Sequence, residues 1–263
     1  MDLDLSLLPR TAEQMRGALN SLYFAAARLA PASARERDPE LDARAALVEQ
    51  SYYRLLRMVN ELSAVRYLDG EPLPLQDRDI VEFVADIFAR AASLAPFRGL
   101  ETRLVCAADS HICAFCPDAL EQLLYQLLSN AFQFTPSGGL VTVELRLSAG
   151  RVLLSVEDTG PGIAPDRLGT LFDSYHQEAA PAPPPQGMGL GLAVCRGIAQ
   201  GHGGVLTAES RQGKGSRFTF SMPDRTCASA LSDVRFDYGG GFNRALMALS
   251  EALPPEAFRI RNL

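Results

Sequence analysis

The chain has 263 residues, of which 47% are hydrophobic and 21% charged, as in ordinary globular proteins. Its 25 basic and 31 acidic side chains leave a net charge of −6 at pH 7, which argues against a general binder of nucleic acids or of anionic membranes. No apolar run approaches the roughly 20 residues of a membrane span, and the first residues lack the pattern of a signal peptide, so we expect a cytoplasmic protein. Five cysteines, an odd number, argue against a secreted disulfide framework.

Two segments near the N-terminus have the apolar spacing of amphipathic helices, at residues 11–30 and at residues 41–67. Pro31 and Pro39 separate them within a short charged connection, so we expect a helical hairpin. A lone hairpin buries little apolar surface, and a second copy from another chain is its natural partner. The pattern therefore predicts a four-helix dimer, and the alternative is a single hairpin that packs on the next domain.

Beyond a linker at residues 69–74, helices and strands are mixed. Helices are expected over residues 79–95, from Pro117 to residue 131, and over residues 190–201. Helices and mostly antiparallel strands without strict alternation predict an α+β fold, in which helices and a sheet form a sandwich. The expected strands are residues 101–106, 111–116, 140–147, 151–156, 204–209 and 216–221.

These patterns divide the chain into a helical hairpin at residues 1–70, a sandwich at residues 75–223 and a tail at residues 224–263. The tail has leucines at helical spacing between residues 242 and 253, which predicts an amphipathic helix. Such a helix can dock a partner or pack on its own chain, and packing on its own chain is the preferred interpretation.

Two polar side chains lie where a ligand could use them. Asn130 is a carboxamide in an apolar helix stripe, and its oxygen suits Mg²⁺; the alternative is a buried asparagine that bridges a neighbouring strand. Asp158 follows a strand and precedes Gly160 and Gly162, whose small size lets the backbone turn sharply and lie close to a ligand. Its carboxylate can accept a hydrogen bond from an exocyclic amino group such as that of adenine, and a simple turn is the alternative.

A third stretch, Gly187, Gly189 and Gly191, opens the helix expected at residues 190–201. Exposed backbone N–H groups at a helix N-terminus form an anion site suited to phosphates. A flexible connection is the alternative reading of the same glycines.

Taken in order, these stretches resemble the motifs of sensor histidine kinases. Residues 120–136, LEQLLYQLLSNAFQFTP, resemble the N box; residues 158–163, DTGPGI, resemble the G1 box. Leu171 and Phe172 resemble the F box, and residues 187–192, GMGLGL, resemble the G2 box. Residues 201–223, GHGGVLTAESRQGKGSRFTFSMP, are similar to the end of the same ATP-binding domain.

The resemblance implies a GHKL, or Bergerat-type, ATP-binding fold with nucleotide between helices and sheet, and ATP and Mg²⁺ as ligands. Asn130 would then hold Mg²⁺ at the phosphates, and Asp158 would bind the adenine amino group. Residues 176–186 would form the lid over the nucleotide. The nucleotide itself would be surrounded by glycines and one leucine: Gly160 and Gly162 at the adenine, and Gly187, Gly189, Leu190 and Gly191 at the phosphates.

The hairpin resembles the family's dimerisation and phosphoacceptor domain but departs from its motif. Where the family has H-E-L-R-T-P-L, this chain has EQMRGALNSL, which puts Glu13 at the phosphoacceptor position and Gln14 at the following acid. The first histidine of the sequence is His111. Because a glutamate cannot form a phosphoramidate, we expect no autophosphorylation at this position.

Two further departures concern catalysis. Gln126 stands where ATP-hydrolysing relatives have a glutamate, and a neutral amide cannot deprotonate water. Gln133 stands where kinases often present a lysine to the phosphates, so a stabilising cation is lost. Hydrolysis of ATP is therefore disfavoured. The hairpin also argues against a serine kinase of this fold, because such kinases do not usually carry one.

We therefore expect a histidine-kinase-like protein of two-component signal transduction that binds Mg-ATP without phosphorylating a histidine of its own. Its partners would be a second copy or a different kinase, bound through the hairpin, and a response regulator in a phosphorelay. One alternative is a non-enzymatic dimerisation or docking module with nucleotide as a structural or switching ligand. Another is a kinase that acts in trans on a partner's histidine.

Overall fold

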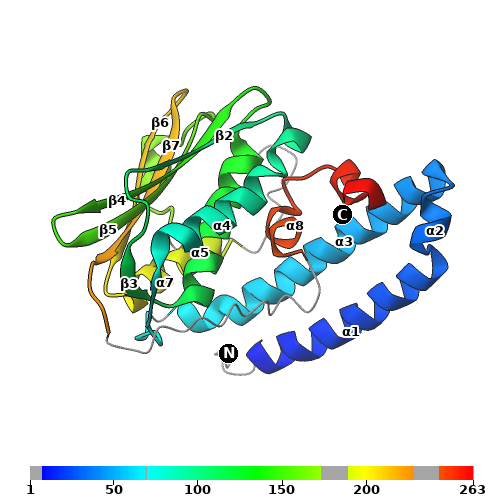
Figure 1. Ribbon diagram of the computed structural model, residues 1–263, viewed down its shortest axis with the longest axis horizontal. Coiled ribbons are helices and arrows are strands. Elements are labelled where there is room, and N and C mark those ends of the chain that lie inside the picture. Colours follow the sequence, from blue (N-terminus) through cyan, green and yellow to red (C-terminus); the bar gives the residue numbers. More distant parts are fainter. Residues whose placement is uncertain (1–7, 69, 173–188, 228–242, 263) are drawn as a thin grey trace.

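The computed structural model describes residues 8–68, 70–172, 189–227 and 243–262, and a five-stranded sheet lies at one end of it, opposite the helical hairpin (Figure 1). One neighbouring pair, β2 and β4, is parallel, and the other pairs are antiparallel, as expected. In spatial order the strands are β2 (Glu101–Cys106), β4 (Leu140–Ser148), β5 (Arg151–Asp158), β7 (Gly215–Pro223) and β6 (Val205–Arg211).

The two faces of the sheet differ in chemistry because side chains alternate along a strand. Val141, Val143 and Leu145 of β4 point to one face and are buried. The alternate positions point to the opposite face, where Arg217 of β7 forms ion pairs with Glu144 of β4 and with Glu157 of β5. One face therefore builds the core, and the other is polar.

Three helices cover the apolar face of the sheet: α4 (Ile80–Ala92), α5 (Pro117–Phe134) and α7 (Gly191–Gly201) (Figure 1). Asp79 starts α4, since its carboxylate accepts hydrogen bonds from the backbone N–H groups of Val81 at 2.8 Å and Glu82 at 3.2 Å. In α5, Leu120, Leu123 and Leu127 recur at helical spacing and are fully buried. The predicted α+β sandwich is confirmed.

The predicted hairpin is also present, as α1 (Leu8–Leu29) and α3 (Pro39–Ser63), joined by the short helix α2 (Ala32–Arg35). Asp38 ends the connection, where its carboxylate accepts from the N–H groups of Glu40 and Leu41, and Pro39 takes the first turn of α3. The 3₁₀ helix η2 (Ala64–Tyr67) completes the second arm. None of the described helices is long and apolar enough to cross a bilayer.

The end of the chain lies between the hairpin and the sandwich (Figure 1). It comprises α8 (Arg244–Leu249) and the 3₁₀ helices η4 (Pro255–Phe258) and η5 (Ile260–Asn262), and α8 contacts α3, α4 and α5. Leu246, Leu249 and Phe258 are fully buried. The preferred prediction, packing on its own chain, is confirmed, although the helix is shorter than the predicted residues 242–253.

Some elements differ from the prediction. The strand β1 (Gln76–Asp79) was not expected; it pairs antiparallel with β3 (Ile112–Phe115), which is shorter than the predicted residues 111–116. Two short helices, η3 (Ala95–Arg98) and α6 (Pro165–Leu168), were not expected either. The proposed division into residues 1–70, 75–223 and 224–263 stays a prediction.

Candidate functional site

Asp158 is the last residue of β5, and only 7% of its surface is exposed. The backbone N–H of Gly160 donates to its Oδ1 at 2.8 Å. Burial raises the pKa of the Asp158 carboxyl, and the backbone N–H groups of Gly160 and Ser216 oppose this rise. The carboxylate is thus oriented by the turn that follows it.

Glycines bring the backbone close to Asp158. A Cβ on Gly160 would lie 2.8 Å from Asp158 Oδ1 and 2.9 Å from the carbonyl oxygen of Phe134. Gly162 has φ +70°, and a Cβ there would collide with the carbonyl of Arg211. The two predicted glycines therefore act differently, Gly160 by close approach to α5 and Gly162 by a left-handed backbone.

Gly215, which the sequence analysis did not single out, also borders Asp158. Its φ is +90°, and a Cβ would collide with the carbonyl oxygen of Asp158. The available signal was the stretch Gly213-Lys214-Gly215 between two predicted strands, which is typical of a tight turn.

Asn130 lies on α5, four residues after Gln126 and four residues before Phe134. Its neighbours Ser129 and Ala131 are buried, whereas Asn130 itself is half-buried. The Gln126 side-chain Nε2 donates to Asn130 Oδ1 at 3.4 Å. Asn130 thus contacts its own helix, and its role as a magnesium ligand or as a structural asparagine stays a prediction.

The start of α7 meets the same part of α5. Gly189 has φ +69°, Leu190 is the buried N-cap, and Gly191 is the first residue of the helix. A Cβ on Gly191 would collide with the amide of Gln126. Gly187 and the predicted lid at residues 176–186 lie outside the described residues.

The structure therefore brings the three predicted motifs together along α5. The turn after Asp158 touches α5 at Phe134, and the start of α7 touches it at Gln126. Asn130 lies between these two contacts, about one helical turn from each. An acceptor carboxylate, a carboxamide oxygen and a helix N-terminus with its free N–H groups thus line one region of the fold.

The comparisons agree with this geometry. Residues 116–226 match the family described as histidine kinase-, DNA gyrase B-, and HSP90-like ATPase. The aerobic respiration control sensor protein ArcB of Escherichia coli K12 is 36% identical over 171 residues, or 64% of this chain and 21% of ArcB. Residues 116–226 are therefore similar to the ATPase domain of histidine kinases, and the chain resembles part of a sensor protein.

A second sensor protein and a solved structure are also similar to this chain. Sensor protein SrrB of Staphylococcus aureus NCTC 8325 is 31% identical over 182 residues, which cover 68% of this chain and 31% of SrrB. The crystal structure of full-length ShkA in complex with AMPPNP matches with a TM-score of 0.67 and 26% identity, over 89% of this chain and 48% of ShkA. Because 89% of the chain is more than the sandwich and the tail together, that match includes part of the hairpin. The chain spans about a fifth of ArcB and about a third of SrrB.

Proposed function

We propose that this histidine-kinase-type domain binds Mg-ATP in the region bounded by Asp158, Asn130 and the start of α7. The observation that carries the proposal is the convergence of the three motifs on α5. A relative of the same architecture is described in complex with AMPPNP, an ATP analogue. The protein would serve two-component signal transduction.

The residues present fit this ligand. One oxygen of Asp158 is held by Gly160 N–H, and the buried carboxylate would accept the adenine amino group. Asn130 would supply an oxygen ligand to Mg²⁺, which otherwise keeps waters and phosphate oxygens. The phosphates would lie at the N-terminus of α7, with Gly189, Leu190 and Gly191 around them.

We further propose that the chain does not phosphorylate itself on α1. Glu13 is exposed and lines a cavity of about 460 Å³ between the hairpin and α5, together with Arg16 and Gln126. The position that resembles the phosphoacceptor thus faces the nucleotide-binding domain, but a carboxylate there cannot form a phosphoramidate.

Incubation with radiolabelled [γ-³²P]ATP tests this part of the proposal. We expect the wild type to remain unlabelled when incubated alone. Labelling of a separate histidine-bearing kinase hairpin by the wild type, but not by Asp158→Asn, would support a kinase acting in trans. Acid-labile label on the wild type alone would contradict the proposal.

Exposed apolar side chains on the hairpin support the proposal of a dimer. Met15, Leu22 and Leu55 are 44%, 66% and 48% exposed, although each belongs to the apolar stripe of its helix. Together with neighbouring side chains they line an apolar groove of about 250 Å³ between α1 and α3. A second hairpin, of the same or another chain, would cover this groove, and a response regulator would be a separate partner.

The second candidate is a non-enzymatic docking module in which nucleotide is a structural or switching ligand. The neutral side chains of Gln126 and Gln133 favour it, because neither supplies the charge that hydrolysis or phosphoryl transfer uses. Mg-ATP binding without any transfer to a partner histidine would support this alternative.

A further inference from the structure

Arg57 of α3 is buried where three parts of the molecule meet: the hairpin, the ATPase domain and the C-terminal segment, which comprises α8, η4 and η5. Its Nη1 donates to the hydroxyl of Ser129 on α5 and to the carbonyl of Ala248 on α8, both at 2.6 Å. Its Nε donates to Glu61 at 3.1 Å, and the carboxylate of Glu251 lies 3.7 Å away. The guanidinium is therefore fixed by partners from all three parts.

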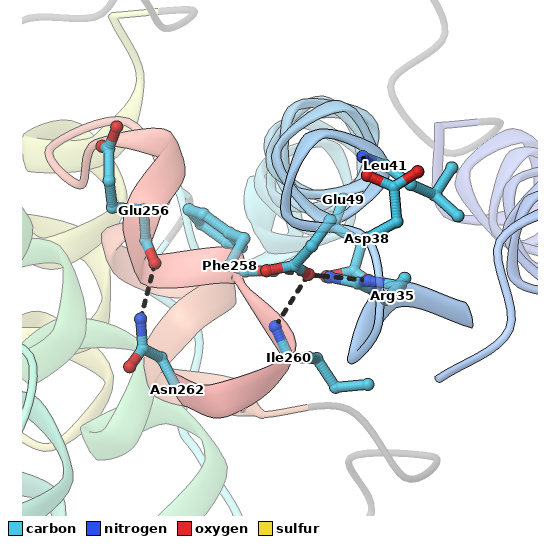
Figure 2. A network of polar contacts seen from close by, with 9 residues as sticks. Arg35, Asp38, Leu41, Glu49, Glu256, Phe258, Ile260 and Asn262 are labelled. Carbon is cyan, nitrogen blue, oxygen red and sulfur yellow. Dashed lines mark hydrogen bonds and ion pairs between the residues drawn. The ribbon is translucent and has the colours of Figure 1, made fainter. Parts of the chain in front are cut away.

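The C-terminal segment holds α3 in this position through several backbone groups. Gln50 and Arg54 donate to the carbonyls of Leu253 at 2.7 Å and Ser250 at 3.2 Å. Figure 2 shows the far end of this contact, where Arg35 and Glu49 face Phe258 and Ile260. There Arg35 donates to the carbonyl of Phe258 at 3.1 Å and pairs with Glu49 at 2.5 Å. The placement of Arg57 against α5 thus depends on the C-terminal segment.

Arg57 also contacts the amide next to the proposed magnesium ligand. Its Nη2 donates to Oε1 of Gln126 at 3.5 Å, and Nε2 of Gln126 donates to Oδ1 of Asn130 at 3.4 Å. A guanidinium is only a donor, whereas each carboxamide has one oxygen and one NH₂ group. Arg57 therefore favours the orientation of Gln126 in which its NH₂ group faces Asn130.

The same constraint passes to Asn130. Because Gln126 offers NH₂, Asn130 turns its oxygen toward Gln126. The amide of Gln126 lies against Gly191, so this is the side of α5 that faces the start of α7. With Gln126 reversed, Asn130 would turn its NH₂ group to that side, and an NH₂ group cannot ligate Mg²⁺.

We propose that Arg57 is a positioning residue that, through Gln126, keeps the Asn130 oxygen directed toward the nucleotide phosphates. The inference rests on the proposed Mg-ATP site. It couples the packing of the hairpin and of the C-terminal segment to the affinity for magnesium, because Arg57 binds both. Arg57 itself touches neither ligand.

The test compares Arg57→Leu and Gln126→Leu with matched controls in the full chain. Arg44→Leu removes an exposed arginine of α3 that pairs with Glu40, away from the C-terminal segment, and Gln122→Leu makes the same change as Gln126→Leu one turn earlier on α5. The first readout is the side-chain NH₂ resonances of Asn130 in the nucleotide-free protein. The second is the affinity for ATP with Mg²⁺ and with EDTA.

We expect both test variants, and neither control, to shift the Asn130 NH₂ resonances. Both should lower the gain in ATP affinity due to Mg²⁺ by about tenfold, as for other residues that orient a metal ligand, with the affinity in EDTA unchanged. Arg57→Leu leaves Glu61 and Glu251 buried without their cation; if it does not fold, Gln126→Leu decides.

Unchanged Asn130 resonances in Gln126→Leu, or equal effects in the controls, would overturn the inference. A wild type that binds no ATP would refute the proposed function instead. In that case the resonances still decide whether Arg57 orients Asn130, because they are measured without nucleotide.

Discussion

Truncation of Leu22 tests the dimer because this side chain is 66% exposed and borders the groove between α1 and α3. Leu22→Ala removes three carbon atoms, each worth about 0.8 kcal/mol when buried. Scaled by the exposed two-thirds, the loss is about 1.6 kcal/mol for each copy and about 3 kcal/mol for the dimer. We therefore predict that the dimer dissociation constant rises about 200-fold.

Sedimentation equilibrium over a range of protein concentrations measures this constant. Val205→Ala is the matched control, since Val205 is 54% exposed but lies on β6, away from the hairpin. The control should dissociate like the wild type. A wild type that stays monomeric, or a Leu22→Ala variant that dissociates like the wild type, would refute the reasoning.

Three further predictions concern stability and are checked by urea unfolding. The ring of His202 accepts a hydrogen bond from Cys116 N–H and contacts the Ile198 carbonyl, and burial lowers its pKa. As the pH falls through the usual histidine pKa of about 6.5, the unfolded chain therefore binds more protons than the folded protein. Stability should fall from pH 7 to pH 5, and less so in His202→Gln; equal slopes would contradict this. Gly162→Ala should cost about 1–3 kcal/mol because its φ is +70°, whereas Gly169→Ala, with open space around it, should cost less than about 0.5 kcal/mol. Arg35→Met should cost about 3–5 kcal/mol, since it leaves Asp42 and Glu49 buried without their cation, and a cost below about 1 kcal/mol would argue against a fixed ion pair.

Elements with a strong local pattern could be predicted from the sequence. The alternating Val141, Val143 and Leu145 predicted β4, and the apolar stripe of α5 predicted a buried helix. The order of the motifs also predicted one site with Asn130 and Asp158; the turn after Asp158 does touch α5, the helix of Asn130, and the shared site itself stays a prediction. Local propensity and the motifs agree with the fold here, so each was readable without knowledge of distant contacts.

Features that depend on contacts between distant segments could not be predicted. The strand β1 consists of four polar residues, Gln-Asp-Arg-Asp, and forms only because β3 pairs with it. The leucines of the tail predicted that α8 buries one face but not that it packs against α3 and α5. Arg57 interrupts the apolar stripe of its helix, and this interruption was a signal of a buried charge. Its partners could not be predicted, because Ser129 and Ala248 lie on other segments.

Calorimetric titration of Mg-ATP into the full chain, beside Asp158→Asn and the control Asp109→Asn, tests the proposed site most directly. Asp109 is exposed, whereas asparagine at position 158 would replace one carboxylate oxygen with a donor that opposes the adenine amino group. We predict one-site binding by the wild type and the control, and a loss of about 1.5–3 kcal/mol, roughly 10- to 150-fold, in Asp158→Asn. No binding by the wild type, or equal binding by Asp158→Asn, would contradict the assignment of this region as a nucleotide site.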